Sequence, residues 1–566
     1  MSGENVYENS IHGGALLIYA SRLKFLTIFF TILFLGLVGK LLYLQVMKND
    51  ILSQQVTQQR AIETPLKDIR GNIYDRNMIP FTDREDKFYV IVIPNLIKDA
   101  AQVYENLSNF TGYTIQQIKE TLNENRPVTF VIDNYSEEEI SNYLNQPGIK
   151  MIRLSKRYGH QSLARHIIGY VNGTDQLGYS GIEKAFNQYL DINKKMSIGM
   201  IGDAVKRSIT GLGYRVVNCF NNDDHSAVRL TLDYHIQDII EEIIDKRMES
   251  GAVILTDIKT GDILGLASRP NYSQNQIERY LGSKGSELVN KAFSAYDAGS
   301  VFKIVVSAAA FEKNIAYLDM PFNCTGYIEV DGKKFTCHKE EGHGEMSFIQ
   351  GFAYSCNPLF IDTGLKLGYQ SIISMAERFG FGSTVSLFDG LEQQSGNIPN
   401  KKYVSPREIA NISIGQGEIL VTPIQVVDMV TTIANNGVRK KLNIVDAIVN
   451  DNGNVIKQLR YEDDTRIISE EIAKKIQKMM EEVTISGTGQ NARLEEYGGA
   501  AGKTGSAETG WMVNGKTKVH AWFVGYFPVT NPKYAMVVFV EDGRQGGAAA
   551  APIFREIAEN VLELNY

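Results

Sequence analysis

The stretch Tyr296–Lys313, with the sequence YDAGSVFKIVVSAAAFEK, carries the strongest structural and chemical signal in the chain. Its run of apolar residues predicts a buried helix that opens at or near Ser300. Ser300 and Lys303 are three residues apart, so they share one face of the first helical turn. The stretch therefore predicts a hydroxyl and an amine side by side at a helix N-terminus.

A serine and a lysine in this setting can carry out nucleophilic catalysis. A serine hydroxyl is a weak nucleophile until a base removes its proton. Burial lowers the pKa of a lysine because desolvation disfavours the charged form, so Lys303 can be that base. The helix N-terminus adds backbone N–H groups and a positive dipole end where an oxyanion would form.

The Ser-x-x-Lys motif alone is weak evidence, because the chain repeats it and two related motifs elsewhere. These repeats are Ser21-x-x-Lys24, Lys259-Thr-Gly, Ser273-x-Asn275 and Ser395-x-Asn397. The triplet at Lys259 falls in a hairpin turn, where Gly serves turn geometry and Lys is solvated. By contrast, Lys503 lies in the small-residue stretch GGAAGKTGSAETG, against which a ligand can lie. Ser355-Cys356-Asn357 lies at a helix-to-loop junction that suits the presentation of side chains.

Three motifs follow one another in a meaningful order: Ser300-x-x-Lys303, Ser355-x-Asn357 and Lys503-Thr504-Gly505. This is the ordered set of penicillin-binding proteins and serine β-lactamases. The chain resembles a class B penicillin-binding protein, a monofunctional peptidoglycan D,D-transpeptidase, over nearly all of its length. Further stretches that carry the resemblance are Arg70–Asn77 (RGNIYDRN), Arg157-Tyr158, His166–Val171, Gly181–Glu183, Gly415–Gly417 and Thr422–Gln425. The Ser-Cys-Asn triplet and a nearby Cys/His loop resemble sporulation-type Gram-positive members.

The predicted fold class is α+β. A helical pattern ends near residue 250, strand patterns follow at 251–268 and recur at 520–542, and a helical pattern closes the chain. Together with the resemblance, this predicts a single N-terminal transmembrane helix, an elongated α/β pedestal domain, and a transpeptidase domain whose antiparallel sheet is covered by helices. The predicted bounds are 1–22 for a cytoplasmic tail, 23–47 for the transmembrane helix, 48–225 for the pedestal (dimerisation-type) domain and 226–566 for the transpeptidase domain.

The resemblance also implies a role for each motif residue. Ser300 attacks the penultimate D-Ala carbonyl of a stem peptide that ends in D-Ala-D-Ala, and Lys303 accepts the hydroxyl proton. Ser355, helped by Lys503, relays a proton to the leaving amine, and Asn357 hydrogen-bonds the substrate amide. The residues implied to bind the carboxylate end, or to lie along it, are Thr504, Gly505 and Ser506. Backbone N–H groups of Ser300 and Ser506 form the implied oxyanion hole.

The apolar run near the N-terminus predicts the membrane anchor. Phe25–Gly39 contains no charge, and Leu23–Met47 reaches the roughly 20 residues that a bilayer requires if Lys24 and Lys40 extend toward the interfaces. A cleaved signal peptide and a buried core helix are the competing readings, but no cleavage motif follows and no polar face is present. Arg22 and Lys24 precede the run, which favours a cytoplasmic N-terminus and an extracytoplasmic catalytic domain at the cell membrane.

Composition narrows the function further. The 566 residues carry a formal charge of −7, so no basic excess indicates nucleic-acid binding. Four cysteines are too few for a disulfide scaffold in a chain of this length. Three of them, Cys324, Cys337 and Cys356, nevertheless lie close together, after the Ser300 motif and no later than the Ser355-Cys356-Asn357 motif.

These cysteines predict a structural zinc site, although the chemistry itself requires no cofactor. Cys324 and Cys337 bracket a predicted hairpin with an Asp331-Gly332 turn, and His343 follows in a Gly-rich run. The expected ligand set is Asp297, Cys324, Cys337 and His343. Asp297 stands where the family usually has Glu, but it can equally be an N-cap residue. His338 and Cys356 are the other candidates for the fourth ligand, although Cys356 is expected to point into the core. A Cys324–Cys337 disulfide and free buried thiols are the alternatives.

The expected partners are peptidoglycan stem peptides on lipid-linked or nascent strands, β-lactams that acylate Ser300, and a polytopic glycan-polymerising membrane protein. Nucleic acid is not expected. The alternative functions are a D,D-carboxypeptidase or β-lactamase, in which water replaces the acceptor amine, and a non-catalytic, membrane-anchored β-lactam sensor or scaffold. An idle scaffold would be expected to lose a motif residue, and none is lost.

Overall fold

A computed structural model describes residues 8–48, 61–123, 128–132, 135–144, 146–172, 177–201, 214–217, 226–513, 516–543 and 545–564. The chain divides into two compact units, each of which is discontinuous in sequence. Unit 1 comprises residues 1–67, 88–152 and 195–219, and unit 2 comprises residues 68–87, 153–194 and 220–566.

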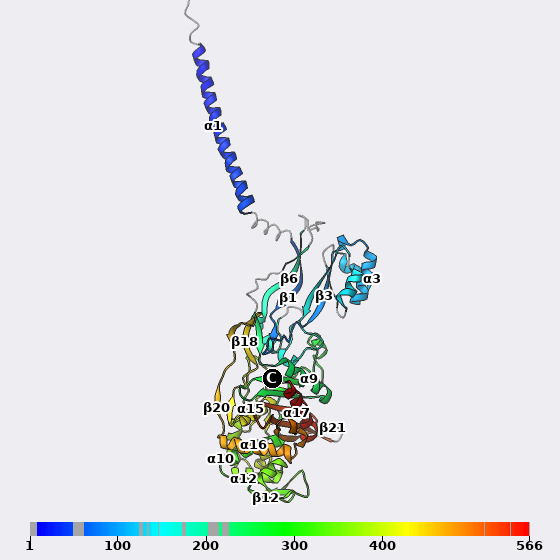
Figure 1. The fold of residues 1–566 in the computed structure, drawn as a ribbon, viewed down its shortest axis with the longest axis vertical. Helices are drawn as coiled ribbons and strands as arrows, with labels where there is room; N and C mark the ends of the chain where they lie inside the picture. Colours follow the sequence, from blue (N-terminus) through cyan, green and yellow to red (C-terminus); the bar gives the residue numbers. More distant parts are fainter. Residues whose placement is uncertain are drawn as a thin grey trace, which may run out of the picture. The chain divides into compact units, whose positions relative to one another are not determined.

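Unit 1 begins with the long helix α1 (Glu8–Leu42), which ends in a short π-helical turn at Tyr43–Met47. The segment Arg22–Val46 is long and apolar enough to cross a membrane. It nearly coincides with the predicted span at 23–47. The helix also extends through much of the predicted tail, because it starts at Glu8 rather than near residue 23 (Figure 1).

Beyond α1, the described residues of unit 1 form two small sheets and the helices α3, α4 and α5. One sheet has the order β1-β6-β7, and the other has the order β4-β3-β5. Helices α3, α4 and α5 pack on the second sheet through an apolar core that includes Val90, Leu107 and Ile118. The element bounds are β1 Ala61–Arg70, β3 Glu85–Val92, α3 Ala100–Thr111, α4 Ile115–Leu122, β4 Val128–Ile132, α5 Glu137–Leu144, β5 Ile149–Lys156, β6 Asp191–Ile201 and β7 Tyr214–Val217.

The predicted domain boundary at residue 225 lies close to one division between the compact units, at residues 219 and 220, but the predicted pedestal is not a single unit. Residues 68–87 and 153–194, expected in the pedestal, belong to unit 2. Within that unit, β2 (Ile73–Tyr74) pairs in parallel with β8 (Ser226–Leu230). Residues 68–87 therefore belong to unit 2 because their strand pairs with one about 150 residues further along the chain. A pairing over that distance produces no local pattern in the sequence.

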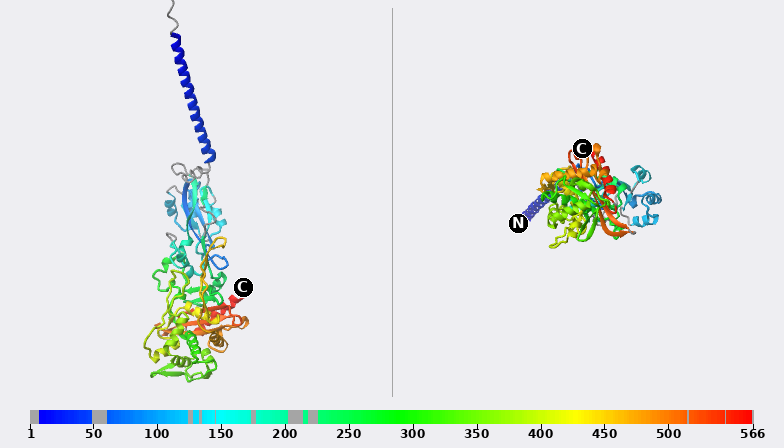
Figure 2. Two further views of the ribbon diagram at one scale, coloured as in Figure 1. Left: turned by 90° about the vertical axis from the view of Figure 1, so that its left-hand side faces the viewer. Right: turned by 90° about the horizontal axis from the view of Figure 1, so that it is seen from below.

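A five-stranded antiparallel sheet with the order β10-β9-β23-β22-β21 forms the centre of unit 2. Alternate residues of its strands face opposite sides, as period-2 side-chain alternation requires. Val253 and Leu255 of β9 face a core shared with α9 and α17, whereas Ala252 and Ile254 face a core shared with α10 and α15. The bounds are α9 Tyr234–Arg247, β9 Gly251–Asp257, β10 Ile263–Arg269, α15 Pro423–Ala434, β21 Ala501–Val513, β22 Lys516–Phe527, β23 Tyr534–Val540 and α17 Gly546–Glu563. Figure 2 shows the orange and red C-terminal strands together with red α17 beside the green strands.

The remaining helices gather on the α10 side of the sheet. Helix α10 (Lys303–Glu312) is buried at almost every position, as expected of a helix that is apolar all round. The other helices of unit 2 are α6 Arg165–Ile168, α7 Gly181–Ala185, α8 Asn187–Leu190, α11 Phe348–Ala353, α12 Asn357–Leu367, α13 Tyr369–Arg378, α14 Pro406–Ser413 and α16 Glu470–Ile485. The short strands are β11 Tyr296–Asp297, β12 Pro321–Cys324, β13 Tyr327–Val330, β14 Lys333–Thr336, β15 Gly344–Ser347, β16 Leu420–Val421, β17 Val438–Lys440, β18 Val445–Asn450, β19 Val455–Gln458 and β20 Asp464–Arg466. The α+β fold class is confirmed.

A buried carboxylate ties the early segments of unit 2 together. Glu183 is fully buried and accepts hydrogen bonds from Arg70 Nε at 2.5 Å, Arg157 Nε at 2.8 Å and the Tyr158 hydroxyl at 2.8 Å. Burial opposes the charge of Arg157, but Glu183 and Asp83 raise the pKa of its guanidinium. The resemblance stretches at Arg70, Arg157 and Glu183 are therefore the parts of one ion network.

We predict that Glu183→Gln destabilises unit 2 by about 3–5 kcal/mol, because it leaves two guanidinium groups buried without their shared carboxylate. Thermal and denaturant unfolding of the purified chain measure this change. The matched control is Glu249→Gln, which removes an exposed carboxylate of the same unit. Equal stability of the two variants would contradict the role of the network.

Candidate active site

Ser300 lies just ahead of helix α10 rather than on it. A 3-10 turn at Gly299–Phe302 holds Ser300, and α10 starts at Lys303. The sequence predicted the helix start within three residues. Ser300 is half-buried and lines a cavity of about 860 Å³. Among the described residues its hydroxyl makes no hydrogen bond to another side chain, so it faces the cavity ready to meet a ligand.

Lys303 is fully buried beneath this cavity, and the Ser355–Asn357 segment supplies its hydrogen-bond acceptors. Its Nζ donates to the Ser355 carbonyl at 2.7 Å, to Ser355 Oγ at 3.2 Å and to Asn357 Oδ1 at 2.8 Å. Desolvation lowers the pKa of Lys303 to about 8. Roughly one tenth of this amine is therefore neutral at pH 7, and the neutral amine is the form that a general base requires.

Lys503 approaches Ser355 from β21. It is fully buried, and its Nζ donates to Ser355 Oγ at 3.0 Å and to the Thr504 carbonyl at 3.0 Å. Desolvation, and then the charge of Lys303, lower the pKa of Lys503 well below the ordinary value. Ser355 Oγ thus lies between the amines of Lys303 and Lys503. Because burial lowers the pKa of both amines, each can gain or lose a proton more readily than an exposed lysine. Such a hydroxyl can pass a proton from one side of the cavity to the other.

Strand β21 forms one wall of the cavity. Thr504 and Ser506 line it, and Thr504 Oγ1 lies 2.5 Å from Thr488 Oγ1. Gly505 between them has a steric purpose, because a Cβ there would lie 2.8 Å from Val301 Cγ2. The strand can therefore pack directly against the turn that carries Ser300.

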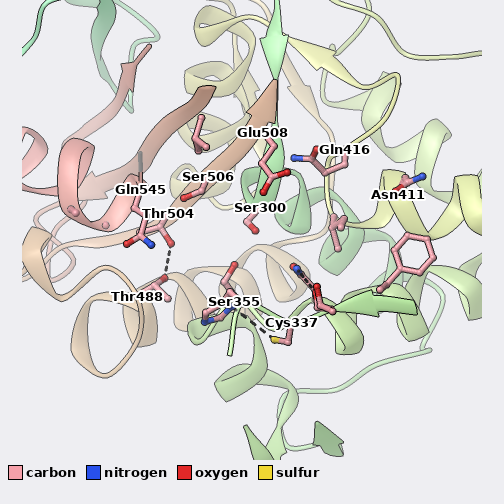
Figure 3. Close-up of a pocket in the computed structure, with 18 of the residues that line it drawn as sticks. Ser300, Cys337, Ser355, Asn411, Gln416, Thr488, Thr504, Ser506, Glu508 and Gln545 are labelled. Atoms are coloured by element: carbon pink, nitrogen blue, oxygen red, sulfur yellow. Dashed lines mark hydrogen bonds between the residues drawn. The ribbon is translucent and has the colours of Figure 1, made fainter. Parts of the chain in front are cut away.

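The cavity contains the predicted residues Ser300, Ser355, Asn357, Thr504 and Ser506, and also polar residues that the sequence analysis did not single out (Figure 3). The polar lining residues that were missed are Lys333, Lys334, Thr336, Asn411, Gln416, Thr488, Asn491, Glu508 and Gln545. Gln416 belongs to the Gly-Gln-Gly stretch already noted, and Glu508 follows Thr504 and Ser506 at every second position, so strand alternation would have identified it. The others come from separate segments that only the fold brings together.

The cysteines form a compact cluster beneath the cavity. One ligand atom each from Cys324, Cys337, His343 and Cys356 lies within 4.8 Å of every other. The predicted hairpin is present as β13 and β14, with positive φ at Asp331 (49°) and Gly332 (72°), as a tight hairpin turn demands. The three cysteines of the cluster are free thiols, so the structure does not contain the alternative Cys324–Cys337 disulfide.

Asp297 is not part of this cluster, and the expectation that it supplies the fourth ligand is wrong for this structure. Asp297 lies on β11, which pairs with β16, and its carbonyl accepts a hydrogen bond from Trp522 Nε1 at 3.1 Å. Cys356 supplies the fourth atom instead. The expectation that Cys356 points into the core is confirmed, since Cys356 is fully buried. The part of the core that it reaches is the cysteine and histidine cluster.

The cluster has the donor set of a zinc site. Tetrahedral Zn with bonds of about 2.3 Å to sulfur places its ligands about 3.8 Å apart. Cys337 Sγ lies 3.6 Å from His343 Nδ1. The neighbouring Cys356 thiol, and then His338, lower the pKa of Cys337, while burial lowers the pKa of His343. A thiolate and a neutral imidazole are the forms that bind zinc.

Comparisons with known proteins agree with this site. The model of the penicillin-binding protein transpeptidase domain matches residues 251–559, and the model of the penicillin-binding protein dimerisation domain matches residues 65–198. Stage V sporulation protein D of Bacillus subtilis is 28% identical over 96% of this chain and 85% of its own length. Peptidoglycan D,D-transpeptidase MrdA of Acinetobacter baumannii is 26% identical over 95% and 87%, respectively. Peptidoglycan D,D-transpeptidase FtsI of Escherichia coli K12 is 26% identical over 93% and 89%.

The transpeptidase match alone spans more than half of the chain, and a dimerisation domain precedes it. On this evidence the chain belongs to the penicillin-binding protein transpeptidases, as a class B member.

Proposed function

We propose that this enzyme cross-links peptidoglycan stem peptides through an acyl-enzyme on Ser300. The observation that carries the proposal is the convergence of three distant motifs on one cavity, with Ser355 Oγ between Lys303 Nζ and Lys503 Nζ. A family member with this arrangement acts on peptidoglycan and binds β-lactams, which acylate the same hydroxyl.

Acylation uses the neutral form of Lys303. Ser300 Oγ attacks the carbonyl of the penultimate D-Ala, and its proton passes to Lys303 Nζ. The backbone N–H groups of Ser300 and Ser506 are suited to stabilise the oxyanion, because β21 packs against the Ser300 turn. The C–N bond then breaks, and Ser355 passes a proton to the departing amine, with Lys503 at 3.0 Å to support the relay. Asn357, held by Lys303, is placed to hydrogen-bond the substrate amide.

Strand β21 is suited to bind an extended peptide. In the five-stranded sheet it pairs only with β22, so its other edge offers backbone groups to a ligand strand. Thr504 and Ser506 then bind the terminal carboxylate, and Gly505 lets the strand pack against the Ser300 turn. An amine from a second stem peptide resolves the ester and forms the cross-link. When water does so instead, the product is that of a D,D-carboxypeptidase.

The membrane arrangement follows from α1. Its apolar segment Arg22–Val46 serves as a single-pass anchor, with the N-terminus in the cytoplasm and the catalytic unit outside. At that surface the enzyme meets stem peptides on lipid-linked or nascent strands. A polytopic glycan-polymerising membrane protein is the partner that would supply them.

A fluorescent penicillin tests the central proposal. The wild-type chain is expected to be labelled covalently and Ser300→Ala is expected to remain unlabelled, as judged by in-gel fluorescence and intact-mass analysis. Labelling that survives in Ser300→Ala would contradict the assignment of the nucleophile.

The rate of penicillin acylation is predicted to rise with pH and to level off above about 8, the pKa of Lys303. Below that pH the amine is increasingly protonated and cannot accept the hydroxyl proton, so the rate falls by about tenfold per pH unit. Stopped-flow acylation between pH 6 and 9.5 measures the profile. A rate independent of pH across this range would exclude Lys303 as the base.

Gly415→Ala is predicted to slow acylation by at least about tenfold, or roughly 1.4 kcal/mol in the barrier. A Cβ at Gly415 would lie 2.0 Å from the Gly299 carbonyl and would displace the Ser300 turn. Gly390→Ala is the matched control, because its φ of 82° resembles the 70° of Gly415 but no atom lies within 4 Å of the added Cβ. Equal acylation rates in the two variants would show that the contact does not position Ser300.

We also propose that Cys324, Cys337, His343 and Cys356 hold one structural zinc ion. Four protein ligands complete a tetrahedral shell and leave no position for a reactive water. Because Cys356 lies between Ser355 and Asn357, the ion would hold the segment that binds Lys303. It would also hold Cys337, which lines the cavity. The metal would thus fix the shape of the cavity, and Ser300 would remain the nucleophile.

Metal analysis of the purified chain is expected to find about one zinc per chain, and Cys324→Ala is expected to lose it. Removal of zinc should lower the Tm by at least about 3 °C, which corresponds to roughly 1 kcal/mol for a large domain. The control is Cys219→Ala, because Cys219 is the one cysteine of the four in the sequence that is not a proposed ligand; it lies outside the described residues. A chain without zinc whose Tm does not change with chelator would contradict the proposal.

A further inference from the structure

Glu508 is a charged group of the Ser300 cavity that the proposed chemistry does not use. It lies on β21, and it is the one acidic residue among the described residues that line the cavity. Figure 3 shows its carboxylate directed into the cavity, toward the side where Ser300 lies. A cationic group of a bound ligand is therefore attracted to this part of β21.

The fold does not account for the charge of Glu508. No ion pair within the described part of the chain involves Glu508, and its side chain is exposed. Structural carboxylates of the same unit differ, because Glu183 and Glu541 are paired with an arginine and a lysine, respectively. The lysines Lys333 and Lys334 line the cavity from the β13–β14 hairpin, which is a different wall. The carboxylate of Glu508 is therefore available to a ligand.

Glu508 continues a row of residues that face the cavity from β21. Thr504, Ser506 and Glu508 are all paired with β22 and stand at alternate positions, so they lie on one face of the strand. At the rise of an extended strand, Glu508 lies about 7 Å from Ser506 and about 13 Å from Thr504. The second distance exceeds the Debye length of about 8 Å at physiological salt, so Glu508 repels a carboxylate at Thr504 only weakly.

The proposed function gives the direction of the donor peptide along this row. Its terminal carboxylate is assigned to Thr504 and Ser506, and its scissile carbonyl to the Ser506 N–H. The rest of the donor then extends along the free edge of β21 toward Glu508. Since an extended peptide rises about 3.4 Å per residue, the first or second residue before the acylated D-Ala lies beside Glu508. The leaving D-Ala departs at the Thr504 end, where the acceptor then enters, so Glu508 lies beside the donor and away from the acceptor.

The donor peptide carries a cation in this part of its chain. Cross-linking requires an amine on the stem peptide that accepts the acyl group, and the donor is a stem peptide of the same kind. The amino groups of its two D-Ala residues are in amide bonds, so the free amine belongs to a residue that precedes them. A free alkyl amine has a pKa of about 10 and is an ammonium at neutral pH.

We propose that Glu508 is a specificity-determining residue that binds the side-chain ammonium of the donor stem peptide. This inference rests on the proposed transpeptidase function and deepens it, because it names a feature of the substrate that the enzyme selects. A stem peptide with a free side-chain amine is the preferred donor. A stem peptide whose amine has already been acylated, as in an existing cross-link, has lost the ammonium and is a poorer donor. Glu508 binds and orients the donor, and it takes no part in proton transfer or bond exchange.

The test compares two thioester donors in the full-length, detergent-solubilised chain. Both donors consist of Nα-acetyl-lysine and D-Ala joined to thioglycolate, which retains a terminal carboxylate. The lysine side-chain amine is free in one donor and acetylated in the other, and mass spectrometry of thioglycolate release gives kcat/KM for each. The wild-type chain is expected to favour the free amine by about twofold to fivefold, the range for an exposed ion pair, and Glu508→Gln is expected to bring this ratio to about one.

Salt provides a readout that a merely structural role would not move. The wild-type ratio between the two donors should fall as ionic strength rises, because salt screens the attraction, and the Glu508→Gln ratio should change little. Glu508→Asp should restore part of the preference. Glu462→Gln, which removes an exposed carboxylate outside the cavity, is the matched control and should keep the wild-type ratio.

Two results would overturn the inference. One is a wild-type chain that takes both donors equally well at low salt. The other is a wild-type preference that persists in Glu508→Gln, whether the rates with both donors stay the same or fall in parallel, since a parallel fall indicates only a general loss of structure. Failure of the proposed function itself is distinguishable, because the wild-type chain would then show no Ser300-dependent penicillin labelling at all.

Discussion

The burial of one lysine amine governs the architecture of the catalytic unit. Lys303 has no exposed surface, and water therefore does not solvate its charge. Oxygen atoms of the Ser355–Asn357 segment replace that lost hydration, because they accept hydrogen bonds from Lys303 Nζ at 2.7–3.2 Å. This requirement fixes where α11 ends and α12 begins. It also explains the positive φ of Ser355 (56°), a strained conformation that turns the carbonyl and the hydroxyl toward the same amine.

Sequence reasoning succeeded where the signal is local. The apolar run after Ser300, the strand patterns at 251–268, and the Asp331-Gly332 turn each follow from a local apolar run or from turn chemistry. The order of three motifs then added long-range information that no single motif contains. That combination predicted one site from Ser300, Lys303, Ser355, Asn357 and Lys503. In the structure Ser300, Ser355 and Asn357 line the cavity, and the two buried lysines donate hydrogen bonds to Ser355 Oγ.

It failed where the partner of a residue lies far along the chain. Asp297 was favoured as a metal ligand because it departs from a family pattern, but its strand pairs with β16 and directs it elsewhere. Cys356 was assigned to the core correctly, yet the sequence could not reveal that two other thiols and an imidazole form that part of the core. The assignment of residues 68–87 and 153–194 to unit 2 was missed for the same reason, because the Glu183 network and the β2–β8 pairing join segments that no local pattern connects.

The free edge of β21 has a consequence for how the protein must behave in a crowded envelope. An unpaired strand edge is a template for any extended chain, including another copy of the same protein. Most sheets close such an edge, but an enzyme that captures its substrate as a strand must leave it open. Glu508 places an exposed charge on this strand. A charge on an edge strand discourages pairing with another copy, so the same edge can stay open to substrate with less risk of self-association.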